Sequence, residues 1–398
     1  MNEKLKTEAD VVVLGGGIFG LASAYFLCRF GKKVILIEKK DVGSGASGSN
    51  EAWVWLSSRK QAVLPFARLS QQFYANFEET FGMDVEYNNC GGYIVAESEE
   101  EMKMFKPWVQ GRWNEGMIEM QLLDAADFHA RLPQVSKHVV GATWNPLDGC
   151  VNSILVCVAL KDAIKAQGGE VWTQTNVTAI NLKGNRVHEV ECSRGTIRTD
   201  VVVNATGSWA AQIGKLVNVD IPILPNRMTV LVSEPIAPFM DTVMMSATYV
   251  FEELAKAKKL EAIEAGEVEE LEAGYVYTQL RKGNLLLGRT EDFVGYDNLV
   301  NFECPVAIAK CINDLTPPLR NKKVNIIRSF ANFFPYTKDD LPVMGAVPGV
   351  EGFVMASGLN GGGMALGLGC GFTIAQQVAF RDSMIPIEPF SITRKSLY

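Results

Sequence analysis

A glycine-rich turn near the N-terminus constrains the fold of this chain more than any other feature. The aliphatic run Val11–Leu14 predicts a short buried strand, Gly15-x-Gly17-x-x-Gly20 follows it, and a helix is expected over residues 21–30. In such a unit the first glycine permits the tight turn, the second lets a pyrophosphate approach the backbone, and the third lets the helix pack closely on the strand. Free N–H groups at the helix start favour an anion. The pattern predicts a dinucleotide-binding βαβ unit.

An acidic residue follows the turn at the spacing that a dinucleotide site requires. The second predicted strand, Val34–Ile37, ends at Glu38, which lies 18 residues beyond Gly20. A carboxylate there can hold both ribose hydroxyls, and it disfavours the 2′-phosphate of NADP. Residues 43–50 form a loop of small residues whose backbone N–H groups and hydroxyls can wrap a ligand, and a plain linker is the alternative.

Composition limits the class of protein. The 398 residues suit two or three domains, and 47% hydrophobic with 21% charged residues is typical of a soluble globular protein. The net charge of −7 argues against nucleic-acid binding, which favours a basic face. The eight cysteines contain no Cys-x-x-Cys pair, so we expect no metal site. Cys150/Cys157 and Cys304/Cys311 are each seven residues apart, which predicts buried thiols on helix faces in a cytoplasmic protein.

Two later segments repeat the pattern of a strand that runs into glycine. Residues 201–204 are a β-branched strand followed by Ala205-Thr206-Gly207. The apolar strand 353–357 leads into Gly358 and then a run of three glycines. Small residues at such turns leave bare backbone N–H groups that face a ligand. An NAD enzyme has no obvious need for a third element of this kind.

The segment 361–380 is apolar enough to suggest a transmembrane helix. Its glycines and the pair Gln376-Gln377 argue against that interpretation. We therefore expect a buried helix beside the cofactor and no transmembrane segment.

The remaining segments predict a second, β-rich unit. Residues 86–145 look like an insertion, with an acidic helix that begins at Ser98 and gives way at Pro107. Residues 221–330 contain period-2 strands, which suggests the antiparallel platform of a substrate domain. The stretch 251–273, rich in Glu, Lys, Ala and Leu, predicts an amphipathic helix that forms either a solvated structural face or a docking surface for a partner subunit.

Taken together, the three glycine turns, Glu38 and the C-terminal stretches 340–345 and 357–363 resemble a known family. They look like the FAD-dependent glycine oxidase/D-amino-acid oxidase family, which includes sarcosine oxidase and the flavin subunits of bacterial proline, hydroxyproline and opine dehydrogenases. The resemblance implies an α/β fold with a discontinuous Rossmann-type FAD-binding domain and an antiparallel β-rich α+β substrate domain. The first domain is expected over residues 1–85, 146–220 and 331–398, and the second over 86–145 and 221–330.

The resemblance also implies that FAD is bound non-covalently, because Phe334 stands where some sarcosine oxidases attach the cofactor through cysteine. By position, the three turns, the loop after Glu38 and one strand valine would hold the cofactor. These residues are Gly15, Gly17, Ile18, Phe19, Gly20, Glu38, Lys39, Ser44, Gly45, Ala46, Ser47, Val177, Ala205, Thr206, Gly207, Gly358, Asn360, Gly361, Gly362, Gly363 and Met364.

The implied reaction is hydride transfer from an amine-bearing carbon to flavin N5, which leaves an imine that hydrolyses. Such a site needs a cation or hydroxyl for the substrate carboxylate, and many relatives carry an arginine at the place of Phe334. In its absence, Arg328, Tyr277 and Tyr336 are the candidate catalytic residues, and Arg281 is an alternative cation. For each of them, a surface ion pair or a core tyrosine is the other interpretation.

The substrates implied are a D-amino acid, a proline- or hydroxyproline-like amine, or an N-methyl glycine-like amine, with a dehydrogenase favoured over an oxidase. One alternative is a flavin-carrying subunit of a multi-subunit dehydrogenase that is inactive alone. Another is an NAD(P)H-dependent flavin reductase or monooxygenase. That enzyme would need a second nucleotide-binding glycine turn of the N-terminal kind, and none is found.

Overall fold

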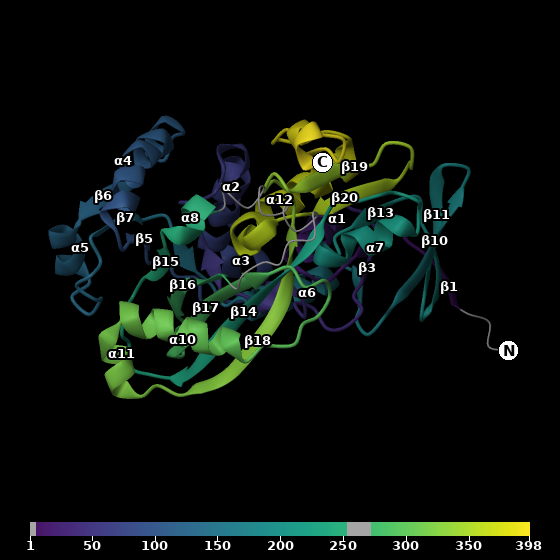
Figure 1. The fold of residues 1–398 in the computed structure, drawn as a ribbon. Helices are drawn as coiled ribbons and strands as arrows, with labels where there is room; N and C mark the ends of the chain where they lie inside the picture. Colours follow the sequence, from purple (N-terminus) through teal and green to yellow (C-terminus); the bar gives the residue numbers. More distant parts are fainter. Residues whose placement is uncertain (1–4, 253–271) are drawn as a thin grey trace.

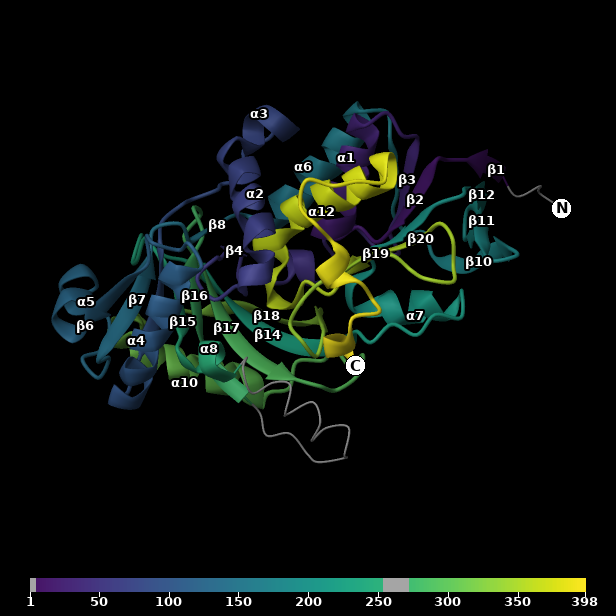
Figure 2. The same cartoon turned by 90° about the horizontal axis from the view of Figure 1, so that it is seen from above.

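The N-terminal residues form the strand–turn–helix unit that the sequence predicts. The computed structural model describes residues 5–252 and 272–398 (Figure 1). In it, β2 (Val11–Leu14) runs into α1 (Ile18–Arg29), and β3 (Val34–Ile37) lies parallel to β2 (Figure 2). Every residue of β2 and β3 is buried, as expected for a parallel sheet that is covered on both faces. The apolar runs that identified these strands therefore belong to the core.

A six-stranded sheet brings the three glycine turns to one edge. Its order is β19-β20-β13-β2-β3-β9, and all neighbours are parallel except β19 and β20. Asn204 lies opposite both Leu14 and Met355, so β13 is central between β2 and β20. Since parallel strands end at the same edge, the turns after β2, β13 and β20 meet there. The other strands are β9 (Glu170–Trp172), β13 (Val202–Asn204), β19 (Val343–Ala346) and β20 (Phe353–Ser357).

The apolar C-terminal segment forms a helix inside the fold. α12 (Gly363–Phe380) packs against α1 and α2 (Leu64–Ala75). Its glycines allow this approach, because a side chain at Gly367 would lie only 2.6 Å from Ile18. Asn360–Phe380 is the one segment among the described residues that is long and apolar enough to cross a membrane, and most of it is buried. This is the buried helix that its composition predicts.

The second large sheet has eight strands in the order β18-β14-β17-β16-β15-β5-β7-β6. All neighbours are antiparallel except β5 and β15, which run parallel. α10 (Glu303–Leu315) packs on β14, β16 and β17 and covers part of one face. The strands are β5 (Gly92–Ala96), β6 (Gln121–Asp124), β7 (Gly141–Asn145), β14 (Leu224–Pro235), β15 (Val243–Ser246), β16 (Glu272–Gln279), β17 (Asn284–Asp292) and β18 (Ile326–Tyr336).

Figure 2 shows how the two large sheets are arranged. The six-stranded sheet lies on the right with α1, α6 (Ser153–Ala166) and α12. The eight-stranded sheet lies on the left with α4 (Glu99–Asn114), α5 (Ala125–Arg131) and α10. The six-stranded sheet takes its strands from segments 1–85, 146–220 and 331–398. The eight-stranded sheet takes its strands from 86–145 and 221–330, with β18 extending past residue 330.

Two smaller sheets and several short helices make up the rest of the described chain. The four-stranded sheet has the order β1 (Leu5–Glu8), β12 (Gly195–Arg198), β11 (Arg186–Cys192) and β10 (Val177–Lys183). In the two-stranded sheet, β4 (Trp53–Val54) pairs with β8 (Gly149–Cys150). The other α-helices are α3 (Phe77–Phe81), α4 (Glu99–Asn114), α5 (Ala125–Arg131), α7 (Ala210–Lys215), α8 (Thr248–Glu252) and α11 (Pro317–Lys322). Short 3₁₀ helices span η1 (Ala46–Gly48), η2 (Gln61–Val63), η3 (Gly207–Trp209), η4 (Asn360–Gly362), η5 (Glu388–Phe390) and η6 (Lys395–Leu397).

Two local predictions are wrong, and one falls outside the described residues. α4 begins after Ser98 as predicted but continues through Pro107, which is exposed, so water can solvate the carbonyl that lacks an N–H partner. Cys150 lies in β8 and Cys157 in α6, so these two buried thiols do not share a helix. The amphipathic helix predicted over 251–273 lies, apart from its ends, outside the described residues.

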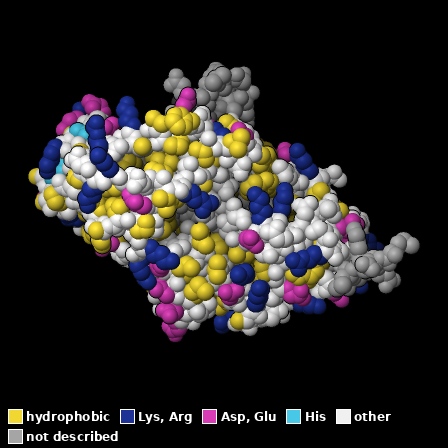
Figure 3. Space-filling model, turned by 90° about the horizontal axis from the view of Figure 1, so that it is seen from below, with side chains coloured by type: hydrophobic (Ala, Val, Ile, Leu, Met, Phe, Trp, Pro, Cys, Tyr) yellow, Lys and Arg dark blue, Asp and Glu magenta, His cyan; other side chains and the backbone are white. Residues whose placement is uncertain are grey.

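The surface carries both signs of charge. Figure 3 shows one face of the molecule, on which Lys and Arg side chains alternate with Asp, Glu and hydrophobic side chains. The net charge is −7. The described residues of this face therefore form no continuous basic area of the kind that nucleic-acid binding needs.

Candidate active site

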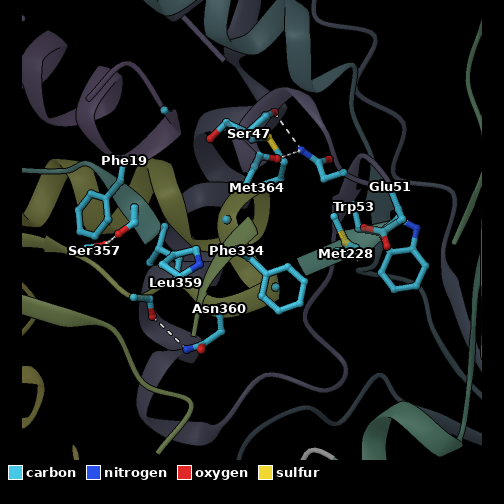
Figure 4. A pocket seen from close by; sticks show the side chains of 18 of the residues that line it. Phe19, Ser47, Glu51, Trp53, Met228, Phe334, Ser357, Leu359, Asn360 and Met364 are labelled. Atoms are coloured by element: carbon cyan, nitrogen blue, oxygen red, sulfur yellow. Dashed lines mark hydrogen bonds between the residues drawn. The ribbon is translucent and has the colours of Figure 1, made fainter. Parts of the chain in front are cut away.

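A cavity lies between the glycine edge of the six-stranded sheet and the face of the eight-stranded sheet, and residues of both sheets line it. Figure 4 shows Phe19 and Ser357 on one side of it, Glu51 and Trp53 on the other, and Phe334 between them. Part of the predicted cofactor set lines the cavity, namely Gly17, Phe19, Ala46, Ser47, Ala205, Gly207, Gly358, Asn360, Gly361, Gly363 and Met364.

The first glycine turn has the shape that a pyrophosphate needs. Gly15 has φ +106°, and a side chain on it would overlap the Ala205 carbonyl oxygen. A side chain on Gly20 would overlap the Gly15 carbonyl oxygen. Gly17 is the N-cap of α1 and presents no side chain there. The start of α1 is therefore accessible to a phosphate group, which its N–H groups and dipole favour.

Glu38 and the loop after β3 close around the same turn. The Ile18 N–H donates to Ser47 Oγ at 2.9 Å, which holds the loop 43–50 against the start of α1. Glu38 Oε2 accepts a hydrogen bond from the Gly16 N–H at 2.7 Å, so this carboxylate lies beside the turn. The two contacts fit the adenosine diphosphate half of FAD.

The remaining predicted cofactor residues do not line the cavity. Thr175 donates its N–H to the Glu38 carbonyl at 2.9 Å, so the start of β10 at Val177 lies near Glu38, on the side expected for the adenine. Lys39 and Ser44 are exposed. The full set outside the cavity lining is Gly15, Ile18, Gly20, Glu38, Lys39, Ser44, Gly45, Val177, Thr206 and Gly362.

The third glycine turn is open toward the cavity. The nearest atom to a side chain placed on Gly361 would be Arg289 Nη1 at 4.0 Å, so the backbone there faces empty space. Asn360 has φ +49°, and its amide accepts from the Thr337 N–H at 2.9 Å and donates to the Gly358 carbonyl at 3.0 Å. These bonds fix the turn in front of α12. Its bare N–H groups and helix dipole fit the electron-rich edge of a flavin ring.

The structure does not bring the three predicted catalytic residues to this cavity. Tyr277 is fully buried in the cluster beneath α10, on the opposite face of the sheet. Arg328 is exposed on β18. Tyr336 is buried and packs edge-on against Phe293, with ring centres 5.1 Å apart. Arg281, the alternative cation, is exposed and forms a surface ion pair.

A buried charged cluster at one end of the cavity was not predicted. Glu51 and Arg289 both line the cavity, each is only 6% exposed, and Glu51 Oε1 lies 3.5 Å from Arg289 Nη1. Arg289 Nε donates to Glu291 Oε1 at 2.6 Å, and the guanidinium lies 4.6 Å from the centre of the Tyr249 ring. Burial raises the pKa of the Glu51 carboxyl, and the Arg289 charge offsets this in part.

The sequence contains one weak signal of this cluster. Arg289 lies two residues after the apolar run 285–287, and a charge that continues a buried strand requires a buried partner. Glu51 gives no comparable signal, because it directly follows the loop of small residues.

Arg59 is a second cation of the cavity. It lines the cavity beside Gly362, and its Nε is buried without a hydrogen-bond partner. Met228, Met245 and Phe334 form an apolar wall of the same space. A buried N–H without an acceptor marks a place where an anionic ligand group can bind.

A buried carboxyl group supports the segment that carries Arg59. Asp148 is completely buried and accepts from the Leu56 N–H at 2.6 Å and from both the N–H and the hydroxyl of Ser57. Burial raises the pKa of Asp148 to about 7, although these hydrogen bonds and the Arg59 charge act in the opposite direction.

Replacing Asp148 with asparagine is expected to remove a pH dependence of stability. A carboxyl whose pKa rises on folding stabilises the protein while it is protonated, so its contribution is lost as pH rises from its ordinary pKa of 3.8 to about 7. A shift of this size corresponds to about 4 kcal/mol. Relative to Asp148→Asn, the wild-type free energy of unfolding in urea should fall by that amount over this range. A difference between the two proteins that is constant with pH would contradict the assignment.

Comparison with known proteins agrees with this geometry. The family model described as FAD dependent oxidoreductase (DAO) matches residues 10–377, so the chain belongs to this family. Mitochondrial sarcosine dehydrogenase of Mus musculus is 26% identical over 95% of this chain and 40% of its own length. The mitochondrial pyruvate dehydrogenase phosphatase regulatory subunit of Mus musculus is 24% identical over 94% of this chain and 42% of its own length. The chain thus spans about two fifths of these relatives.

A solved structure shows the same fold. Glycine oxidase from Geobacillus kaustophilus superposes with a TM-score of 0.85 at 22% identity, over 98% of this chain and 99% of that one. The predicted family, the α/β fold class and FAD as the cofactor are confirmed.

Proposed function

We propose that this protein oxidises the C–N bond of an amino acid or secondary amine to an imine. The substrate would be a D-amino acid, a proline-like amine or an N-methyl glycine-like amine, and the names of the sarcosine and glycine relatives support this class. One observation carries the proposal: the three glycine turns face an apolar wall that contains buried charged groups within a single cavity. FAD, when bound, supplies the acceptor for the hydride that leaves the carbon beside nitrogen.

Different residues of the cavity would bind the cofactor, exclude water and orient the substrate. The turns at Gly17 and Gly361 are placed to hold the cofactor. Met228, Met245 and Phe334 would exclude water from the reacting carbon. Local charges would then orient the two ends of an amino acid.

We propose that Arg59 holds the substrate carboxylate. The Arg59→Met variant is expected to raise KM for an amino acid about 30-fold, because a charge-assisted hydrogen bond in a buried site contributes about 2 kcal/mol. Its flavin content, measured from visible absorbance, should stay at the wild-type level. Steady-state kinetics with an artificial electron acceptor would measure KM.

Arg328→Met is the matched variant, because Arg328 is the cation that the sequence favours and the structure places it on the surface. We expect its KM to stay within about twofold of wild type, as is usual for exposed side chains. A larger KM increase in Arg328→Met than in Arg59→Met would mean that Arg328, and not Arg59, holds the substrate carboxylate.

We propose a dehydrogenase rather than an oxidase. The name of the sarcosine dehydrogenase relative supports this choice, and that of the glycine oxidase relative supports the alternative. Anaerobic titration with sarcosine, both prolines, hydroxyprolines and D-amino acids should bleach the flavin band with one of them. Slow recovery of the band in air, and fast recovery with an artificial acceptor, are the expected results. Bound flavin that no amine bleaches would contradict the proposed reaction.

A second candidate function is a flavin-carrying subunit that is inactive without a partner. The relative named as a regulatory subunit favours it. Large apolar side chains are also exposed near α10 and at the start of β18, namely Leu299, Phe302, Val306, Ile326 and Ile327. Copurification followed by the same titration distinguishes this function from the first.

The eight free cysteines support a cytoplasmic location for either function.

A further inference from the structure

Glu51 is a buried carboxylate that faces the cavity with unused hydrogen-bonding capacity. It lines the cavity and is 6% exposed, and its Oε1 is buried without a hydrogen-bond partner. The 3.5 Å to Arg289 Nη1 is an ion-pair distance that leaves this oxygen free to accept a hydrogen bond. Figure 4 shows the carboxylate on the same side of the cavity as Trp53 and Met228. A buried acceptor of this kind is costly unless a ligand satisfies it.

The charges around Glu51 favour a cationic group rather than an anionic one. Arg289 of β17 is shared between Glu51 and Glu291, whose carboxylate receives the shorter contact of 2.6 Å. Among the described residues, the carboxylates of Glu51 and Glu291 therefore both face this guanidinium. Tyr249 of α8 lies under that guanidinium, and burial holds the pKa of its phenol well above the ordinary value, so it adds no charge. The other cation of the cavity, Arg59, lies beside Gly362.

We propose that Glu51 binds the substrate nitrogen and takes its ammonium proton, so that the amine becomes neutral in the site. One N–H bond of the ammonium breaks, one O–H bond forms on the carboxylate, and the nitrogen keeps the electron pair that hydride loss from the neighbouring carbon requires. No other reactant is needed for this step. The inference rests on the proposed amine oxidation and assigns to Glu51 the recognition of its nitrogen.

The surroundings of Glu51 support this role. Burial raises the pKa of the Glu51 carboxyl, which makes the carboxylate a stronger base than an exposed glutamate. Transfer of the proton also replaces two charges in an apolar space by two neutral groups, which lowers the desolvation cost of binding. Glu291 cannot take this role, because it does not line the cavity and its carboxylate is bonded to Arg289 and to Asn226.

The pH profile of kcat/KM tests the inference. In the wild type, the ionised carboxylate and the substrate ammonium react together, so kcat/KM should be flat between the pKa of Glu51 and that of the amine, about 10. Glu51→Gln can use only the neutral amine. Its kcat/KM should be roughly 100-fold or more below wild type at pH 7 and should rise about tenfold per pH unit toward pH 10. The flavin content of the variant should be unchanged.

Two further variants separate proton transfer from a structural effect. Glu51→Asp keeps a carboxylate, so its profile should stay flat even if its rate is lower. Glu291→Gln removes a charge from the same arginine without removing the base, so its profile should also stay flat. A rising profile in either variant, or a loss in Glu51→Gln that is equal at every pH, overturns the role of Glu51. Failure of every amine to reduce the wild-type flavin overturns the proposed function as well.

Discussion

Replacing Gly17 with leucine is expected to give a folded protein that does not retain FAD. Gly17 has φ −81° and ψ 174°, which any residue adopts, and its added Cβ would lie 3.1 Å from Ser47 Oγ. The backbone conformation therefore accepts a side chain, and Ser47 Oγ must shift by a few tenths of an ångström to make room for it. The leucine would, however, extend into the cavity at the start of α1, where the pyrophosphate is expected. We expect FAD affinity to fall at least about 100-fold, or about 3 kcal/mol.

The measurement is the flavin absorbance of purified protein, followed by titration of the apoprotein with FAD. Gly111→Leu is the matched control, because a side chain at Gly111 in α4 meets no atom within 4 Å. Leucine favours the helical conformation over glycine by about 1 kcal/mol, so this substitution should not destabilise α4. The control should therefore keep its full flavin content. Full flavin content in Gly17→Leu would remove the first turn from the cofactor site.

The sequence predicts the cofactor side of the protein well, because local chemistry determines it. Gly15 and Gly20 have backbone atoms in contact where any side chain would lie, so only glycine fits there. The three strand-to-glycine turns could be found separately along the chain. Their meeting follows from the parallel pairing of β2, β13 and β20, which places the carboxyl ends at one edge.

The substrate side is less accessible to sequence analysis, because it depends on which face of a strand each side chain occupies. Tyr277 has the hydroxyl that a substrate site needs, but β16 directs it into the core under α10. Arg289 lies in the neighbouring strand β17 and lines the cavity. Residues far apart in sequence, such as Glu51 and Arg289, meet only through the packing of the loop 43–50 on the eight-stranded sheet. No local pattern encodes that contact.

Asn360 lies where the sequence predicts, and its side chain also stabilises the third glycine turn. The resemblance places it at the flavin, and it does line the cavity. Its side-chain amide is also fully used within the protein: Oδ1 accepts from the Thr337 N–H at 2.9 Å, and Nδ2 donates to Thr337 Oγ1 and to the Gly358 carbonyl, both at 3.0 Å. Thr337 is completely buried. Asparagine also tolerates the φ of +49° better than most residues.

Asn360→Ala is therefore expected to destabilise the protein by about 4 kcal/mol, the second large effect that the structure predicts. Loss of the amide leaves a buried N–H and a buried carbonyl without partners, which costs about 1–3 kcal/mol each, and alanine in the left-handed conformation costs about 1 kcal/mol more. Asn360→Gly loses the same hydrogen bonds but avoids the backbone strain of the alanine variant, so its free energy of unfolding in urea should exceed that of Asn360→Ala by about 1 kcal/mol.

A comparison of stability and FAD affinity between the two Asn360 variants identifies the role of this side chain. Because the hydrogen bonds of Asn360 to Thr337 and Gly358 hold the turn in front of α12, both variants should also bind FAD more weakly than wild type, and the glycine variant should not recover this affinity. Equal stability of Asn360→Ala and wild type would mean that water replaces the amide. Recovery of both stability and FAD affinity in Asn360→Gly would mean that backbone conformation alone, and not the bonds to Thr337 and Gly358, shapes the third turn.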